Sequence, residues 1–572
     1  MRRASLFLCM AALLAAPLGV GAAGQAAEGG AAAVDDLSNH LEISWLGNPA
    51  EKPWWQGELE QMFNVTIVPN GVGKFQVDKQ QIIVAAGEMP DTGVYFVDSK
   101  VMYQDGVIRS APESMFREYA PNYVKAVDSA YPAAWKVHRA PDKPGEHYGW
   151  ASIRGGSIVG NWLLAFRKDW ADAVGVSLPG DYEANKVQLD EKGKMFYYDD
   201  PSMDIDWLEG LMVALRDGDP DGNGKTDTLP YGSFFYGDLS FSNFGWATIQ
   251  GAFGVGQTGL QGNQLIDGEV VHNFVGPGFR AFTKQIARWW EMGLIDNESL
   301  TQDVDTSLDK QNTGRYGVVM VNTPAIDRDP NGPPDSMISD EDFAAGGELV
   351  LFAPRGPDGH QFAPTYGITN IGDNIPQVWE KSISDAKVAR VMQILDTKAG
   401  LLDFTPEAIA NWAGWAYGKE GAHWNWGGEP GNSSIVRVAQ EDVPAEYPQR
   451  GSLWTNYPNF NPRESYKFSR TPNVYTFYEE YLYTDEIWSK MARPYKWDSY
   501  KETDIQEVMK QRGAALNTLA SEWFAKAVTG EIDVDATWDE YVEDFMRFGG
   551  SEILAEMEKM PTWDEVWGTE SR

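Results

Sequence analysis

Short strand-like segments alternate with helical segments from residue 41 onward, and this order constrains the fold more than any other feature of the chain. The strand-like segments have β-branched residues or apolar residues at every second position, whereas the helical ones space their apolar residues three or four apart. The predicted strands are 41–45, 65–68 and 92–97, and the predicted helices are 55–63 and 78–86, the latter ended by Gly87. Repeated strand-helix-strand units predict a largely parallel sheet covered by helices, which is an α/β fold.

The alternation continues in a second block that begins near residue 153. The predicted elements are a strand running into a helix over 162–170, a helix over 202–215 capped by Ser202 or Asp204, a helix over 278–293 and a buried strand over 315–321. The region 505–560 is expected to be mostly helical. Because 572 residues exceed what one hydrophobic core usually supports, we expect two or more lobes.

The first residues have the arrangement of a secretory signal peptide, which we place at 1–26. Two arginines precede an apolar run over 5–20, and small residues follow. A membrane anchor is the weaker alternative, because Pro17 and Gly19 interrupt the run. The only cysteine, Cys9, lies inside the run rather than at its end. We therefore expect a periplasmic protein that is neither lipid-anchored nor integral to a membrane.

The charge balance and the missing catalytic motifs narrow the function. With 83 acidic and 47 basic residues, the net charge of −36 argues against nucleic acid as a partner. The sequence has no His-Glu-x-x-His zinc helix and no Gly-x-Ser-x-Gly elbow. A pair of carboxylates for glycoside hydrolysis can be neither assigned nor excluded among so many acids, so an enzyme remains an open alternative.

The stretch 217–227 (DGDPDGNGKTD) permits two interpretations. A phosphate-binding P-loop would need glycine where Asp219 stands, and the acidic side chains would repel phosphate. A calcium loop fits better, with Gly224 at the sharp turn of its sixth position. The expected ligands are Asp219, Asp221, Asn223, the Lys225 carbonyl and Asp227. Pro230 replaces the usual glutamate at the twelfth position and rules out a regular exiting helix, so a solvated turn remains the alternative.

The 23 tryptophans suggest carbohydrate as a ligand, because indole faces stack on the C–H faces of sugars. They are dense over 411–417 and 421–428, and we expect Trp424 and Trp426 to lie nearer the surface than Trp207. The stacking candidates are Trp45, Trp246, Trp412, Trp415, Trp424 and Trp426, with His423 and Arg154 as polar contacts. The alternative is that most of these rings belong to the core.

Five motifs in a fixed order give the chain a family resemblance over nearly its whole length after the leader. They are 80–96 (QQIIVAAGEMPDTGVYF), 166–175 (FRKDWADAVG), the calcium-type loop, 289–298 (WWEMGLIDNE) and 417–426 (YGKEGAHWNW). With these motifs the chain resembles the extracellular solute-binding proteins of ABC importers, in the long oligosaccharide-binding branch that includes alginate-binding proteins. The alginate-binding members hold calcium in a comparable loop, with an acid just after the ninth position. This chain has Thr228 there, so Asp217 becomes a candidate replacement.

The resemblance implies a type II-like periplasmic-binding-protein fold, with two α/β lobes, a hinge of crossing strands and a helical C-terminal region. We place the first lobe at 36–150 plus 365–425, and the second at 151–364 plus 426–570. The implied function is capture of an oligosaccharide between the lobes and its delivery to an ABC permease, by a monomer with structural calcium and no catalysis. The alternatives are a calcium-stabilised secreted carbohydrate-active enzyme and a surface glycan-binding adhesin.

Overall fold

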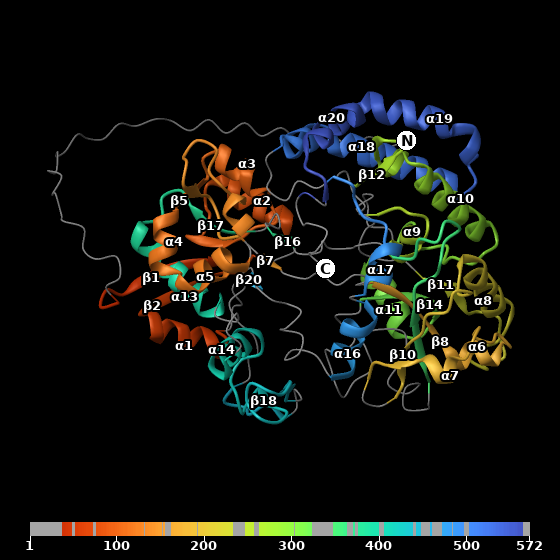
Figure 1. The fold of residues 1–572 in the computed structure, drawn as a ribbon, viewed down its shortest axis with the longest axis horizontal. Helices are drawn as coiled ribbons and strands as arrows, with labels where there is room; N and C mark the ends of the chain where they lie inside the picture. Colours follow the sequence, from red (N-terminus) through yellow and green to blue (C-terminus); the bar gives the residue numbers. More distant parts are fainter. Residues whose placement is uncertain are drawn as a thin grey trace, which may run out of the picture.

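The computed structural model describes residues 37–47, 52–72, 76–130, 132–151, 153–154, 162–190, 193–232, 246–256, 262–302, 304–322, 347–362, 370–371, 376–399, 405–438, 442–447, 458–459, 472–482, 484–496, 503–563 and 565. The predicted signal peptide and Cys9 lie outside these residues. Figure 1 shows two lobes, each built around its own sheet.

The first lobe contains a five-stranded sheet in the order β2-β1-β3-β17-β4. Its strands are β1 (Leu41–Leu46), β2 (Val65–Asn70), β3 (Thr92–Val94), β4 (Ile108–Arg109) and β17 (Gln377–Glu380). β1 pairs in parallel with both β2 and β3, whereas β17 runs antiparallel to β3 and β4. The helices of this lobe are α1 (Trp54–Phe63), α2 (Val77–Ala86), α3 (Ser99–Gln104), α4 (Glu113–Tyr119), α5 (Pro121–Ala130), α13 (Asp385–Ala399) and α14 (Pro406–Ala416). A short strand pair, β5 (Ala111–Pro112) with β6 (Glu146–His147), and a 3-10 turn, η1 (Pro132–Lys136), complete it.

The second lobe contains a six-stranded sheet in the order β11-β14-β8-β15-β10-β9. Its strands are β8 (Trp162–Arg167), β9 (Val187–Gln188), β10 (Met195–Tyr197), β11 (Leu229–Tyr231), β14 (Tyr316–Asn322) and β15 (Leu349–Phe352). Helices α6 (Lys168–Ala173), α7 (Tyr182–Asn185), α8 (Ile205–Asp217), α9 (Ala247–Ala252), α10 (Pro277–Glu291) and α11 (Val304–Asn312) surround the sheet (Figure 1). A hairpin of β12 (Asn263–Ile266) and β13 (Glu269–His272), followed by the turn η3 (Asn273–Val275), precedes α10.

The C-terminal region is helical, as predicted. It comprises α16 (Pro472–Phe477), η7 (Tyr478–Leu482), α17 (Asp485–Lys490), α18 (Ile505–Val528), α19 (Val534–Phe545), η8 (Met546–Gly550) and α20 (Ser551–Lys559). Helix α18 packs on α10, and its apolar face joins the same core cluster as the second sheet. Among the described residues, no helix combines the length and apolarity needed to cross a membrane.

Residues of both large sheets are buried in hydrophobic clusters, one of which contains residues of both lobes. Ile43, Trp45, Ile67 and Trp379 of the first sheet are buried with residues of helix α13. In the second lobe, Phe166, Val318 and Val350 are buried with Leu208 and Leu211 of α8. The other face of the second sheet, with Leu163, Val319 and Leu351, belongs to the same cluster as the first-lobe residues. Because burial of apolar area drives folding at about 25 cal/mol per Å², both clusters stabilise the fold.

Three short strands form a third sheet between the lobes. Its order is β16 (Asn370–Ile371), β7 (Ile153–Arg154) and β20 (Pro458–Asn459). Each strand belongs to a segment that connects an element of one lobe to an element of the other, and Figure 1 shows them between the two larger sheets. They correspond to the crossing strands that the resemblance implies.

The hairpin of β18 (Trp424–Trp426) and β19 (Ile435–Arg437) packs with α14 of the first lobe. Buried Trp412 of the helix and Trp424 of the hairpin share one apolar cluster. The predicted limits assign residues from 426 onward to the second lobe, whereas the structure places this hairpin with the first.

The predicted local elements are confirmed where caps and periodicity agree. Helix α8 begins after Asp204, whose side chain accepts a hydrogen bond of 2.8 Å from the Trp207 N–H, so Asp204 rather than Ser202 is the cap. Helix α2 ends at Gly87, which has a φ of 69°. Glycine adopts that left-handed conformation without the Cβ clash that other residues suffer.

Candidate functional site

The crossing strands leave both large sheets at the carboxyl ends of their parallel strands. In the first lobe, β16 leads into Gln377, which pairs with Val94 at the carboxyl end of β3. In the second lobe, β7 leads into Trp162, which pairs with Asn322 at the carboxyl end of β14. The same edge of each sheet is therefore joined to the hinge. Ligands of open α/β sheets bind outside the carboxyl ends of the strands.

An aromatic group lies at this edge of the second lobe. Tyr197 is the last residue of β10, and its ring centroid lies 4.8 Å from that of Phe477. Tyr481 stacks on Phe477 with an interplanar angle of 25° and is 38% exposed. Burial raises the pKa of Tyr197, and the Asp199 carboxylate raises it further, so its phenol stays protonated. The group thus presents one exposed ring, that of Tyr481, backed by two buried ones.

Polar side chains lie beside these rings. Gln361 is buried, and its Nε2 donates to Asp199 Oδ1 at 2.7 Å and to the Ala353 carbonyl at 2.8 Å. Arg355 Nη2 lies 3.6 Å from Asp199 Oδ2. Ala353 and Arg355 follow β15 directly, so this polar group also lies at the carboxyl edge of the second sheet.

The corresponding edge of the first lobe carries a second aromatic group around a lysine. Trp54 begins α1, the helix that follows β1, and is half-buried. Lys419, after α14, places its Nζ 5.6 Å from the Trp54 ring centroid and 4.1 Å from that of Tyr447. The same Nζ donates to the Tyr447 hydroxyl at 2.6 Å. We name Trp54, Lys419 and Tyr447 the lysine corner.

His423 fixes the backbone on two sides of this corner. Its ring is 0% exposed, its Nδ1 accepts from the Lys419 backbone N–H at 2.8 Å, and its Nε2 lies 2.8 Å from the Tyr447 carbonyl. Because a carbonyl can only accept, the ring is the neutral tautomer with its proton on Nε2. Gly418 has a φ of 109°, and a Cβ there would come within 2.5 Å of His423 Nδ1, so the motif needs glycine.

Most of the predicted stacking residues lie in the core rather than on a surface. The six tryptophans are not brought together: Trp45 and Trp415 are buried in the first-lobe core, and Trp246 is buried in the second. Trp412 and Trp424 are buried in the small cluster of α14 and its hairpin. A ring enclosed in this way offers no face to a sugar in this conformation, although ligand contact at these positions stays a prediction.

The exposure expected of Trp424 is wrong. Its ring is 1% exposed because the β18–β19 hairpin folds it onto α14, and its Nε1 donates to the Gly418 carbonyl at 2.9 Å. Trp426 is half-buried and is the predicted candidate that retains an accessible surface. Trp207, expected in the core, is also half-buried, against Phe166 and Phe352. For Arg154 the structure describes only the backbone, in β7.

Sequence reasoning missed Tyr481, Trp54, Lys419 and Tyr447. Trp54 could have been found from the fold pattern, since a residue that begins a helix after a parallel strand lies at the carboxyl edge of the sheet. No local pattern predicts the contact between Lys419 and Tyr447, because the two residues are 28 positions apart and meet through tertiary contacts.

The 219–227 loop has the turn geometry of a cation loop. Gly222 and Gly224 have φ values of 68° and 80°, and the Gly224 N–H donates to Asp219 Oδ2 at 2.9 Å. Asn223 Nδ2 donates to Asp221 Oδ2 at 2.8 Å and to Asp227 Oδ1 at 3.1 Å. Two carboxylates thus converge on one amide.

The donor set of this loop fits a hard cation in kind, since it offers carboxylate, amide and carbonyl oxygens. In the described part of the chain, no three acidic, histidine or cysteine side chains are arranged to hold a metal ion. Asp217 is turned toward Arg216, whose Nε and Nη2 donate to its carboxylate at 2.7 and 2.9 Å. Pro230 lies in β11, so the loop leads into a strand. This confirms the prediction that no regular helix follows the loop.

Two relatives are similar to the chain in sequence. The fructooligosaccharide ABC transporter substrate-binding protein FusA of Streptococcus pneumoniae is 25% identical over 252 residues, which are 42% of this chain and 41% of FusA. This match therefore spans less than two thirds of that protein. Lipoprotein LipO of Bacillus subtilis is 22% identical over 485 residues, covering 84% of this chain and 83% of LipO. No family model matches the chain.

Solved structures of solute-binding proteins share the fold. FusA in complex with kestose has a TM-score of 0.64 and 19% identity, covering 91% of this chain and 98% of FusA. An HMO-binding, ABC-transporter-associated solute-binding protein from Bifidobacterium longum infantis has a TM-score of 0.66 and 15% identity, covering 93% and 100%. Alginate-binding protein AlgQ2 without calcium ion has a TM-score of 0.61 and 15% identity, covering 91% and 97%. A FusA EF-hand mutant is similar at a TM-score of 0.63 and 18% identity, covering 91% and 98%.

These neighbours are two-lobed, and the described sheets, helices and crossing strands follow the same plan. Sequence and fold together confirm the predicted resemblance: the chain is similar to the extracellular oligosaccharide-binding proteins of ABC transporters and has their two-lobed fold.

Proposed function

We propose that the protein is an exported substrate-binding protein that captures an oligosaccharide between its lobes and delivers it to an ABC permease. The observation that carries this proposal is the position of the aromatic groups. The Tyr481 group and the lysine corner lie at the carboxyl edges of two different sheets, and both edges are joined to the hinge strands. Aromatic faces on both lobes suit a chain of sugar rings.

Closure of the lobes would couple binding to delivery. A ligand that contacts both edges binds the closed arrangement more strongly than the open one, so it shifts the population toward closure. The three short strands between the lobes would serve as the hinge of such a movement. We propose that the protein acts as a monomer in the periplasm without a lipid anchor, in contrast to the relative named lipoprotein LipO.

The experiment is a panel of neutral and acidic oligosaccharides, titrated while intrinsic tryptophan fluorescence is recorded and the sugars are then analysed by chromatography. We expect saturable binding of one ligand per protein and recovery of intact sugar. Breakdown products that increase with protein concentration would support the carbohydrate-active enzyme instead. Replacing Tyr481 with Ala should weaken binding, whereas replacing Phe548, an exposed ring of the C-terminal helical region, with Ala should not.

We further propose structural calcium in the 219–227 loop. Asp219, Asp221, Asn223, the Lys225 carbonyl and Asp227 would hold the ion, with the Asn223 amide turned to present its oxygen. A bound ion would supply the positive charge between the carboxylates of Asp221 and Asp227 that the amide N–H groups supply in this structure.

Chelation should lower the melting temperature, and added calcium should restore it. At a 100-fold excess over the dissociation constant the gain is about 2.7 kcal/mol. Asp221→Ala should abolish the calcium response, whereas Asp217→Ala should retain it because Asp217 is paired with Arg216. Equal melting temperatures with and without chelator, in protein first shown to contain calcium, would contradict the proposal.

A further inference from the structure

A lysine of the first lobe contacts the second lobe. Lys100 lies in the first turn of α3, and its Nζ donates to the Thr503 carbonyl at 3.0 Å. The same Nζ lies 3.9 Å from Asp504 Oδ1. Thr503 and Asp504 directly precede α18, which packs on α10 of the second lobe. We name the contact of Lys100 with these two residues the inter-lobe contact.

Both sides of the inter-lobe contact are held in place by their own lobe. Helix α3 begins after Asp98, whose side chain accepts a hydrogen bond of 3.0 Å from the Val101 N–H. On the other side, Thr503 is only 7% exposed, and the Asp504 N–H donates to Glu556 Oε2 of α20 at 3.1 Å. A donor and an acceptor that are positioned before they meet lose little conformational entropy when the hydrogen bond forms.

The inter-lobe contact lies where the lobes would separate on opening. Helix α3 follows β3, which is parallel to β1, so the start of α3 lies at the carboxyl edge of the first sheet. Figure 1 shows α3 and the C-terminal helices toward the same end of the molecule, at the top, with the hinge strands below them. Neither Lys100 nor Thr503 belongs to the hinge sheet. A rotation about the hinge strands that moves the two edges apart would therefore break the contact.

The hydrogen bond to the Thr503 carbonyl carries more of this contact than the ion pair does. The Lys100 side chain is 16% exposed, so it is mostly shielded from water. A hydrogen bond from a charged donor contributes more to stability than one between neutral groups. The Asp504 side chain, in contrast, is 77% exposed, and solvent screens its attraction for Lys100.

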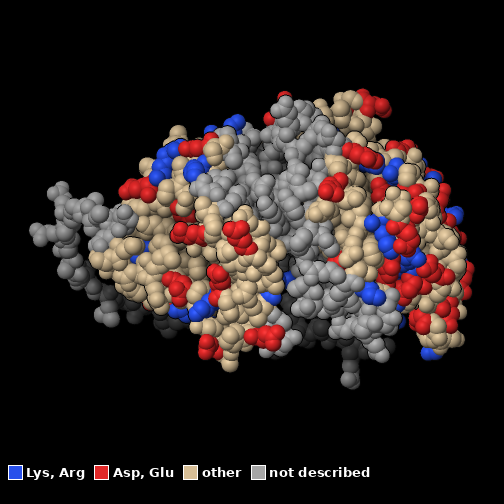
Figure 2. Space-filling view, turned by 60° about the horizontal axis from the view of Figure 1, so that its bottom comes forward, with Lys and Arg blue, Asp and Glu red and all other residues tan. Residues whose placement is uncertain are grey.

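The charge of the lobes opposes their approach and gives a bridging cation its importance. Figure 2 shows Asp and Glu side chains over both lobes, most densely on the second. With a net charge of −36, like charges repel each other as the lobes come together. Lys100 places a positive charge of the first lobe against the acidic second lobe. A hydrogen bond from Lys559 is the main reason that the pKa of Glu556 is lowered, and the charge of Lys100 adds to it.

We propose that Lys100 is a latch residue: its ammonium holds the two lobes together through the Thr503 carbonyl and so sets the balance between the closed and open arrangements. It is a positioning residue rather than a ligand contact. Loss of the latch lowers the closed population, and the apparent dissociation constant of a ligand that binds only the closed arrangement rises by the same factor. The effect on affinity rests on the proposed function, whereas the effect on the distance between the lobes does not.

The test measures the distance between the lobes without ligand, by double electron–electron resonance. The only cysteine of the chain, Cys9, is replaced with Ser so that labels attach only at introduced positions. Spin labels are placed at Ile82→Cys in α2 and Phe548→Cys in η8, because both side chains are exposed and the two elements belong to different lobes.

Four variants are compared in this labelled protein. Lys100→Met removes the donor, Lys100→Arg keeps a cationic donor, and Asp504→Asn removes only the exposed charge. The matched control is Lys526→Met, because the Lys526 ammonium also lies 3.9 Å from a carboxylate, that of Glu522 on the same helix. Its replacement changes the net charge equally without touching the inter-lobe contact. Thermal unfolding of each variant checks that it is folded.

We expect Lys100→Met to lower the ratio of the shorter to the longer distance about threefold to tenfold. Lys100→Arg should restore most of the ratio, and Asp504→Asn and Lys526→Met should leave it within about twofold of the original. The same ratio in Lys100→Met as in the parent protein, or an equal decrease in Lys526→Met, would overturn the latch.

The affinity for an oligosaccharide that binds the wild type should fall by the same factor in Lys100→Met. An unchanged affinity in a variant whose distances shift would overturn the link between the latch and binding. If no oligosaccharide of the panel binds, the proposed function fails, and the distance ratio still decides whether Lys100 is a latch.

Discussion

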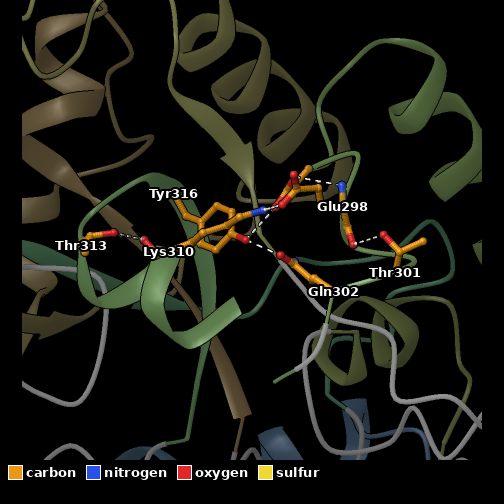
Figure 3. A network of polar contacts seen from close by, with 7 residues as sticks. Glu298, Thr301, Gln302, Lys310, Thr313 and Tyr316 are labelled. Atoms are coloured by element: carbon orange, nitrogen blue, oxygen red, sulfur yellow. Dashed lines mark hydrogen bonds and ion pairs between the residues drawn. The ribbon is translucent and has the colours of Figure 1, made fainter. Parts of the chain in front are cut away.

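Replacing Lys310 with Met should destabilise the second lobe by about 3 kcal/mol, because the change leaves a buried carboxylate without its cation. Lys310 of α11 donates hydrogen bonds to Asp296 and Glu298. Figure 3 shows the surrounding network, with Lys310, Glu298 and Tyr316 labelled. Lys310 Nζ donates to Asp296 Oδ2 at 2.6 Å, and the two side chains are only 9% and 5% exposed. The Tyr316 hydroxyl donates to the same oxygen at 2.8 Å.

The magnitude follows from what Asp296 retains. Removing one partner of a buried ion pair costs about 3–5 kcal/mol. Asp296 keeps the Tyr316 hydroxyl and the Glu298 backbone N–H at 3.1 Å, so we take the lower end of that range. The second bond of Lys310, to Glu298, adds little, because the Glu298 side chain is 64% exposed and solvent screens the pair.

The pKa of Asp296 gives the pH dependence of the same interaction. Burial raises this pKa, but hydrogen bonds from Lys310, the Glu298 backbone and Tyr316 outweigh it, so the net direction is below the usual 3.8. A carboxylate with a lowered pKa stabilises the fold above its unfolded pKa, and this stability is lost as the pH falls through the folded value. The loss in the free energy of unfolding caused by Lys310→Met should therefore be largest near neutral pH and smaller at low pH.

The assay is urea denaturation at 25 °C, followed by far-UV circular dichroism, at pH 7 and pH 3. The matched control is Lys284→Met, because Lys284 pairs with Asp535 at 2.6 Å while both side chains are 51% exposed. That pair should contribute less than about 1 kcal/mol. The double variant Lys310→Met with Asp296→Asn should recover part of the loss. The reasoning is refuted if Lys310→Met costs no more than the control.

Three further predictions concern stability. Asp396 of α13 accepts hydrogen bonds from the start of α5, and burial raises its pKa to about 6. The free energy of unfolding that protonated Asp396 contributes is therefore fully present below its ordinary pKa of 3.8 and is lost as the pH rises through 6. Asp396→Asn removes this titration, so the urea midpoint of the variant should change less with pH between pH 4 and 7. Asp204→Ala removes the α8 cap and should cost about 1 kcal/mol in thermal unfolding. A Cβ on Gly356 would lie 1.5 Å from the Ala252 carbonyl oxygen at the end of α9, so Gly356→Ala should strongly lower the melting temperature. Gly359→Ala is the control and should lower it far less: a Cβ there meets no atom within 4 Å, and the left-handed φ of 82° alone costs alanine about 1–2 kcal/mol.

The sequence predicted the local elements well, because periodicity and caps are properties of neighbouring residues. The helix from Asp204, the strand near 315–321 and the helical end of the chain are all present. The crossing strands could not be derived from periodicity, since each has only two residues and is defined by its partners. They were available only through the family resemblance.

The candidate site was predicted less well, because exposure depends on tertiary contacts. Trp424 and Trp426 stand two residues apart in β18, so both rings lie on the same face of the strand. Trp424 is buried in the α14 cluster, whereas Trp426 packs at the edge of that cluster and is half-buried. Contact of His423 with ligand stays a prediction; in this structure its buried ring links two backbone segments. Such a link joins residues 24 positions apart, which no local pattern encodes.

Small-angle X-ray scattering with and without a bound oligosaccharide tests the central claim most directly. The ligand is a tetrasaccharide already shown by calorimetry to bind one-to-one and to be recovered intact. Because the proposed site lies at the hinge-joined edges of both lobes, saturation should decrease the radius of gyration as the lobes close. An unchanged radius of gyration at full saturation would place the ligand on one lobe alone and contradict capture between the lobes.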